Sequence, residues 1–139
     1  MHPFDDPGRR GANISLTNRN FGCGSSREHA AQALWRWGIA VVVGESFGEI
    51  FADNCVAIGV PCLRVAREDI ARLQDAGDVD GWRQFAVDLE EKTIRSGDLV
   101  VDIDVSDGAR VRLCDGTWDA TTVLLEASEA IERTASRLP

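Results

Sequence analysis

The residues best suited to chemistry lie together in the run Gly22-Cys23-Gly24-Ser25-Ser26-Arg27-Glu28-His29. Its two glycines let the backbone turn tightly and approach a ligand closely. Arg27 can bind a carboxylate through two parallel hydrogen bonds, and two serine hydroxyls stand beside it in the sequence. If a helix starts here, its first main-chain N–H groups and its dipole also attract an anion. The run therefore predicts a site that holds a carboxylate close to a serine oxygen.

Two other interpretations of these residues stay open. Ser25 and Glu28 have the spacing of a capping box, in which the serine oxygen accepts a main-chain N–H of the helix. The glycine pair also occurs in nucleotide-binding loops. However, the position three residues after Gly24 is Arg27 rather than a third glycine, and no Walker-type sequence is present. A nucleotide site is therefore the weaker alternative.

Composition and charge narrow the possible functions. The chain has 139 residues, of which 44% are hydrophobic and 27% charged, values typical of one soluble globular domain. The net charge of -8 disfavours nucleic acid and anionic membranes as partners. No apolar run approaches the ~20 residues that span a bilayer. The first residues also lack the apolar core of a signal peptide. We therefore expect a cytoplasmic protein.

The cysteine pattern predicts free thiols rather than a metal or redox site. The closely spaced pairs typical of zinc and redox sites are absent, and a reducing compartment keeps thiols reduced. We expect small buried or half-buried residues at all four positions, Cys23, Cys55, Cys62 and Cys114. Cys23 alone cannot hold an iron–sulfur cluster, which typically takes four thiolates. His29 is interpreted as a structural residue near the helix start, and no metal or cofactor is expected on this chain.

The first half of the chain must position the glycine loop. Hydrophobic periodicity and turn residues predict, in order, a strand at 13–17, a loop at 18–24, a helix from Ser25 or Ser26 to 37, a buried strand at 39–43, a helix at 46–58 and a strand at 60–65. Ser46 and Glu49 form a second capping-box pattern at the start of the second helix. Alternating strands and helices predict right-handed crossovers and a small parallel sheet.

The second half of the chain has a different pattern. A short helix is expected at 66–73. A longer helix is expected at 78–91, because its apolar residues recur every three or four positions. Apolar residues alternate from 99 to 105, and Asp-Gly pairs at 107–108 and 115–116 are signals for hairpins. Residues 121–125 extend a strand or open the last helix, which is expected at 126–138. The predicted fold class is α/β, with parallel units first, antiparallel hairpins after, and flanking helices.

The glycine loop also carries a family resemblance. Asn20-Phe21-Gly22-Cys23-Gly24-Ser25-Ser26-Arg27-Glu28-His29-Ala30 resembles the motif of the aconitase superfamily's swivel domain, and most closely that of the 3-isopropylmalate dehydratase small subunits. The continuation resembles the same family in order and spacing, through Val41-Val42-Val43, Ser46-Phe47-Gly48-Glu49-Ile50-Phe51, Asn54-Cys55 and Gly59-Val60-Pro61. The resemblance is strong over residues 11–65 and loose elsewhere.

The resemblance implies a fold, an activity and a partner. The fold would be a single swivel domain over 1–139, with a small mixed sheet or β-barrel-like core. Ser25 would be the base that removes a carbon-bound proton, while Ser26, Arg27 and the main chain at Gly24 would bind the substrate. A large subunit would carry a 4Fe-4S cluster that binds the departing hydroxyl, and the chain would be active only with it. The reaction would interconvert 2- and 3-isopropylmalate by dehydration and rehydration, a step of leucine biosynthesis.

The start of the chain departs from the family pattern. Family members usually carry a longer segment before the motif, including a loop that discriminates between substrates, whereas only residues 1–19 precede it here. A further substrate-binding arginine of the family has no visible counterpart. Two alternatives therefore remain: the small subunit of a related hydratase acting on another di- or tricarboxylate, and a truncated non-catalytic assembly module. A homo-oligomer of the isolated chain is also possible.

Overall fold

The computed structural model describes residues 2–25, 27–79 and 84–137. It shows a mixed α/β fold whose parallel strands come first in the chain. After two short 3-10 turns at Pro3–Asp5 and Pro7–Arg9, the first half contains β1 (Ile14–Thr17), α1 (Glu28–Trp37), β2 (Val41–Gly44), α2 (Glu49–Ala57), β3 (Cys62–Arg64) and α3 (Arg67–Val79). The second half contains β4 (Ala86–Asp88), β5 (Thr93–Ser96), β6 (Leu99–Asp102), α4 (Asp107–Asp115), α5 (Ala120–Glu126) and α6 (Ser128–Ala135).

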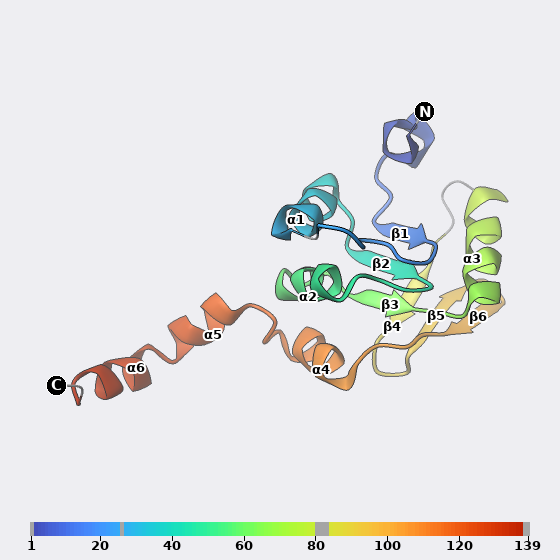
Figure 1. The fold of residues 1–139 in the computed structure, drawn as a ribbon. Helices are drawn as coiled ribbons and strands as arrows, with labels where there is room; N and C mark the ends of the chain where they lie inside the picture. The colour runs from blue at the N-terminus through green and yellow to red at the C-terminus, as the bar shows by residue number, and fades with distance from the viewer. Residues whose placement is uncertain (1, 26, 80–83, 138–139) are drawn as a thin grey trace.

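The first three strands form a parallel sheet in the order β1-β2-β3. Ile14 pairs with Val41, and Val42 pairs with Cys62. The intervening helices α1 and α2 lie beside each other on one face of this sheet (Figure 1). The predicted strand–helix–strand–helix–strand unit is therefore confirmed. Its parallel strands all end at the same edge, so the loops that follow β1 and β2 meet there.

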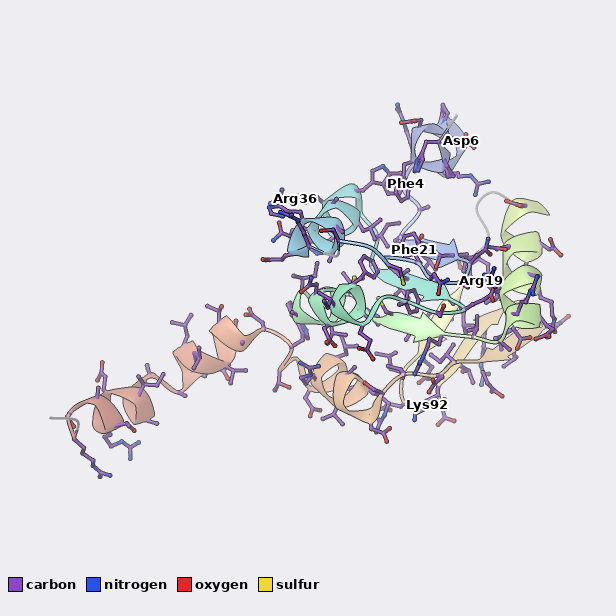
Figure 2. The ribbon with its side chains drawn as sticks, in the orientation of Figure 1. Phe4, Asp6, Arg19, Phe21, Arg36 and Lys92 are labelled. Carbon is purple, nitrogen blue, oxygen red and sulfur yellow. The ribbon has the colours of Figure 1, made fainter. Side chains whose placement is uncertain are left out.

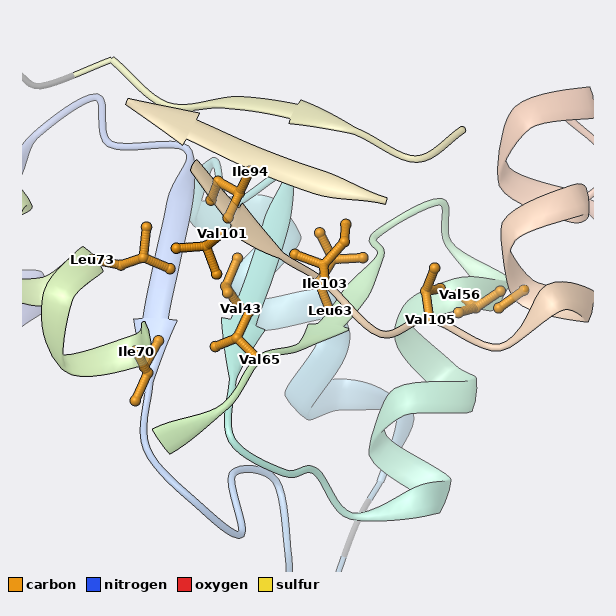
Figure 3. Packing of buried hydrophobic residues seen from close by; sticks show 11 residues of the cluster. Val43, Val56, Leu63, Val65, Ile70, Leu73, Ile94, Val101, Ile103 and Val105 are labelled. Atoms are coloured by element: carbon orange, nitrogen blue, oxygen red, sulfur yellow. The ribbon is translucent and has the colours of Figure 1, made fainter. Parts of the chain in front are cut away.

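The central strand β2 of the parallel sheet is buried on both faces, which explains its continuously apolar sequence. Val42 packs with Ala31, Leu34 and Phe51 under the helices α1 and α2. Its neighbour Val43 points to the opposite face, because side chains alternate along a strand. There a second cluster forms between this sheet, α3 and the antiparallel sheet (Figure 3). Its buried members are Val43, Val56, Leu63, Val65, Ile70, Leu73, Ile94, Val101, Ile103, Val105 and Ala109.

The second sheet is antiparallel and has the order β4-β5-β6. Its link to the parallel sheet is an antiparallel bridge between Arg64 and Asp104, in which each main-chain N–H donates to the other residue's carbonyl, at 2.9 and 2.7 Å. The side chains of this pair also form an ion pair at 2.9 Å. The mixed α/β class is thus confirmed. The barrel-like core is not, because the described strands form two three-stranded sheets and no closed barrel.

The helix expected at 78–91 was wrong. Helix α3 continues to Val79, and residues 86–88 form β4. Phe85, Val87 and Leu89 alternate and pack on the main core cluster, so a two-residue period prevails over the helical spacing. Trp82 lies outside the described residues.

The hairpin turn expected at Asp107-Gly108 was also wrong, because α4 begins there. The Ser106 hydroxyl accepts the main-chain N–H of Ala109 at 3.3 Å and caps this helix. Ala109 is buried, and Gly116 ends the helix with a φ of 73°. Asp107-Gly108 therefore opens a helix instead of turning a hairpin. The hairpin of this region is β5–β6, where Ser96 pairs with Leu99.

The last two helices project from the body of the molecule (Figure 1). The expected C-terminal helix is present as α6, and residues 121–125 lie in α5 rather than in a strand. Neither helix contains a buried residue. None of the described helices is both long enough and apolar enough to cross a membrane.

Candidate functional site

The glycine loop is held along the loop that follows β2. The main-chain N–H of Phe21 donates to the carbonyl of Ser46 at 3.1 Å, and the N–H of Gly48 donates to the carbonyl of Phe21 at 3.0 Å. Phe21 and Phe47 thereby form a parallel bridge beyond the ends of β1 and β2. The pairing of the two strands thus continues into their loops and fixes the start of the glycine loop.

Ser46 holds this junction through its side chain. Its hydroxyl accepts the main-chain N–H of Asn20 at 2.8 Å and donates to the Asn20 Oδ1 at 3.4 Å. Asn20 has a φ of 60°, a left-handed conformation that asparagine tolerates better than most residues. The capping box predicted for Ser46 and Glu49 does not form, because the N-cap of α2 is Gly48, which makes no side-chain cap. The physical reason is that the Ser46 hydroxyl bonds Asn20 instead.

Gly22 lets the loop pass close to α2. Its φ is 74°, and a β-carbon at this position would overlap the ring of Phe51. The Phe21 ring meets the Phe51 ring edge-on, with centroids 5.4 Å apart. Gly48 is equally constrained, since a β-carbon there would lie 2.8 Å from the Gly22 carbonyl oxygen. The loop is therefore packed tightly at its middle. Both positions require glycine, because neighbouring atoms lie too close to leave room for a side chain.

The capping box predicted for Ser25 and Glu28 is also wrong. Helix α1 begins at Glu28, later than expected, and its N-cap is Arg27 without a side-chain hydrogen bond. The Glu28 carboxylate accepts a hydrogen bond from the Gln32 amide at 2.7 Å, so it does not reach back to the preceding turn. Ser25 thus stands before the helix rather than capping it.

The predicted site residues lie consecutively on the exposed end of this loop. Gly24 has a φ of 130° and open space around it, and Ser25 and Arg27 are exposed. Among the described residues, none bonds the Ser25 hydroxyl or pairs with the Arg27 guanidinium. Ser26 lies outside the described residues. The arrangement presents a free hydroxyl and a guanidinium next to the first N–H groups of α1, which suits a carboxylate-bearing ligand.

The cysteines provide no metal site in the part of the chain that is described. No three side chains of His, Cys, Asp or Glu come close enough to hold a metal ion there. All four cysteines are free thiols, as predicted. A hydrogen bond with Cys55, together with burial, raises the pKa of the Cys62 thiol and disfavours its reactive thiolate. Cys23 and Cys114 are exposed, so the expected burial was wrong for these two.

Comparisons with known proteins agree on one family. Residues 8–68 match the family model described as the aconitase C-terminal domain. The chain is 45% identical over 138 residues to the 3-isopropylmalate dehydratase small subunit of Synechocystis sp., covering 99% of this chain and 69% of the relative. The chain belongs to the 3-isopropylmalate dehydratase small subunit family. The Thermus thermophilus member is 42% identical over the same shares of both chains. A solved structure of 3-isopropylmalate dehydratase from Methanocaldococcus jannaschii, 22% identical, shares the fold with a TM-score of 0.62, over 84% of this chain and 68% of that one.

The family membership confirms the resemblance seen in the glycine motif, whereas the residues that position this motif were missed. Ser46, Gly48 and Phe51 support the loop through the contacts described above. The predicted parallel topology could have indicated these supporting residues, because residues that follow neighbouring parallel strands meet at one edge of the sheet. The capping-box pattern at Ser46 is local and does not indicate this longer-range pairing.

Proposed function

We propose that this chain is the small subunit of a hydro-lyase that interconverts 2- and 3-isopropylmalate, with Ser25 as the proton-abstracting base. The observation that carries the assignment of Ser25 is its exposed hydroxyl, which none of the described residues bonds, at the end of a loop whose start is firmly held. A serine that capped its helix would use the same oxygen for a structural bond. Family membership supports the reaction, since the relatives are named as subunits of this dehydratase.

In the proposed reaction, the deprotonated Ser25 oxygen removes a proton from a carbon of the hydroxy-diacid. The electrons of the broken C–H bond form a double bond, and the hydroxyl of the adjacent carbon leaves as hydroxide. Hydroxide then adds to the carbon that lost the proton, and Ser25 returns its proton to the carbon that lost the hydroxyl. The product carries the hydroxyl one carbon away from its original position.

A serine hydroxyl is a weak base in water, so its surroundings must stabilise the negative oxygen. Arg27 and the opening N–H groups of α1 supply positive charge and donors at this end of the loop. Arg27 and Ser26 bind a substrate carboxylate in this proposal, and the main chain at Gly24 approaches the substrate closely because no side chain intervenes. The exposed loop needs a partner surface to exclude water, which a large subunit provides.

We assign the iron–sulfur cluster to the large subunit rather than to this chain. Cluster ligation typically takes four thiolates, and the described residues group no such set. When present in the partner, the cluster acts as a Lewis acid toward the departing hydroxyl. The residues of this chain are then concerned with binding the carboxylate and moving the proton.

The test is an assay of the assembled enzyme. The chain is co-expressed with a dehydratase large subunit, purified without oxygen, and assayed for conversion of 2- to 3-isopropylmalate. We expect Ser25→Ala to lower kcat by about 10²- to 10⁴-fold, the usual contribution of a positioned base, while the complex still forms. Ser128→Ala, at an exposed position of α6, is the matched control and should leave kcat unchanged.

Two results would overturn parts of the proposal. Unchanged turnover in Ser25→Ala would remove this serine from the mechanism. Conversion of another di- or tricarboxylate in preference to isopropylmalate would keep the reaction class and replace the substrate.

A further inference from the structure

A polar hollow of about 330 Å³ lies between the carboxyl ends of the parallel strands and α3. It is lined by Asn18, Arg19, Glu45, Arg67, Ile70, Ala71 and Gln74. Asn18 and Arg19 follow β1, Glu45 follows β2, and Arg67 begins α3 shortly after β3. In open α/β sheets, ligands bind outside the carboxyl ends of the strands, so the hollow occupies a favourable place for a ligand.

The two arginines of the hollow form no ion pair within the described residues. Neither Arg19 nor Arg67 forms an ion pair or a side-chain hydrogen bond with any residue that the structure describes. Glu45 is the acidic residue of the lining, so the hollow holds two guanidiniums and one carboxylate. Their mutual repulsion is relieved when an anion enters between them.

The start of α3 strengthens the attraction for an anion. Arg67 occupies the first position of this helix, where the dipole disfavours a cation. The preceding residue, Ala66, has no side-chain oxygen to cap the helix. The positive end of the α3 dipole and the Arg67 guanidinium therefore lie at the same end of this helix, and both favour an anion there.

The remaining polar groups indicate what else the ligand carries. Glu45 is half-buried, is unpaired among the described residues, and can only accept hydrogen bonds when ionised. A hydroxyl on the ligand would donate to it. Gln74 donates to the Asn18 Oδ1 at 3.2 Å, which leaves the Asn18 amide N–H groups available as donors. The buried Ile70 lines the hollow with apolar surface, and the small side chain of Ala71 beside it leaves room for a ligand.

We propose that this hollow binds a small hydroxycarboxylate, with Arg19 and Arg67 on the carboxylate and Glu45 on the hydroxyl. Arg19 lies on the α3 side of the glycine loop, while Phe21 lies further toward α1 (Figure 2). The hollow is thus at the opposite end of this loop from Ser25. The proposal does not depend on the dehydratase reaction, because it concerns binding to the chain by itself.

The test is a calorimetric titration of the full chain with L-malate, and with succinate, which lacks the hydroxyl. We expect saturable binding of malate and weaker binding of succinate. Arg19→Gln and Arg67→Gln should each weaken malate binding by about two- to fivefold, as expected for exposed charge pairs. Glu45→Gln should reduce the preference for malate over succinate. Arg36→Gln on α1, which lies apart from Arg19 in Figure 2 and does not line the hollow, is the matched control and should bind malate normally.

The control variants distinguish binding in this hollow from a general attraction between the chain and anions. Thermal unfolding of each variant checks the fold, and Arg19, in an exposed loop, can be replaced even if Arg67 proves necessary for folding. Absence of saturable malate binding at millimolar concentrations would overturn the proposal. Sodium sulfate binding as tightly as malate, or Arg36→Gln weakening binding as much as Arg19→Gln, would overturn it as well. Loss of turnover in Ser25→Ala has no bearing on these titrations, so the two proposals fail separately.

Discussion

At the scale of single residues, Gly22 determines how closely the functional loop can approach α2. Its φ of 74° and the Phe51 ring beneath it exclude any side chain. We expect Gly22→Ala to lower the free energy of unfolding by about 2–4 kcal/mol, from positive-φ strain of ~1 kcal/mol and overpacking of ~1–3 kcal/mol. Urea unfolding followed by tryptophan fluorescence measures this change.

Gly108 offers the matched control for this substitution. It lies in α4, and a β-carbon there would meet nothing within 4 Å. Gly108→Ala should therefore be neutral or stabilise by up to ~1 kcal/mol, because alanine favours the helix. If Gly22→Ala and Gly108→Ala unfolded at the same urea concentration, the loop would not be packed on Phe51 as described.

At the scale of elements, the parallel half of the fold could be predicted, whereas much of the antiparallel half could not. The strand at 39–43 is continuously apolar, which only a strand buried on both faces explains well. The apolar side chains of residues 78–91 fit both the two-residue period of a strand and the three- to four-residue period of a helix. The choice between strand and helix depends on contacts with a core that is distant in the sequence. Phe85, Val87 and Leu89 reach that core only once the parallel sheet exists. Local spacing does not contain this information.

The candidate site, like the fold, could be predicted from the sequence only in part. The glycine motif identified the residues, because their types and order are specific. The capping-box pattern was assigned to Ser46 and was left open for Ser25 beside the catalytic interpretation, since this pattern is local and common. In the structure, Ser46 bonds Asn20 across two loops, and Ser25 stands before the helix. Long-range pairing of the loops decided the role of Ser46.

The turn before β5 and the start of α4 are joined by an ion pair with a testable pH signature. The Lys92 ammonium lies 3.2 Å from the Asp107 carboxylate, and Arg110 lies 3.7 Å from it. The hydrogen bond and charge of Lys92, followed by the charge of Arg110, lower the pKa of Asp107 below its usual value. A lowered pKa in the folded state means that this pair adds stability above the unfolded pKa. That contribution is lost as the pH falls through the folded pKa.

Carboxyl titration by NMR tests this pair. We expect Asp107 to titrate at a lower pH than an ordinary aspartate, and Lys92→Met to raise its pKa toward the usual value. The stability difference between wild type and Lys92→Met should vanish in acid below the folded pKa of Asp107, and high salt should shrink it. An Asp107 pKa that does not respond to Lys92→Met would contradict the contact.

At the scale of the whole molecule, the core ends where the C-terminal helices begin. Both hydrophobic clusters lie within residues 4–113, and α5 and α6 contribute to neither. Val123, Leu124, Leu125 and Ile131 are exposed on these helices. The last residue seen packing on the body is Trp118, whose ring lies over Gly59 so closely that a β-carbon there would be 2.9 Å from it. We therefore expect the part of the chain that unfolds cooperatively to end at Trp118.

Truncation after Asp119 tests this boundary. Removing residues 120–139 takes away no buried side chain of α5 or α6, so the melting temperature of the body should change by less than about 2 °C. Trp118→Ala in the full chain should instead destabilise by about 1–3 kcal/mol, less than the ~3–5 kcal/mol of a fully buried aromatic residue, because the ring is half-buried. Differential scanning calorimetry distinguishes the two outcomes. A truncated chain that melted as early as Trp118→Ala would mean that the terminal helices pack on the body in solution, and the apolar residues of α5 and α6 would then belong to its core.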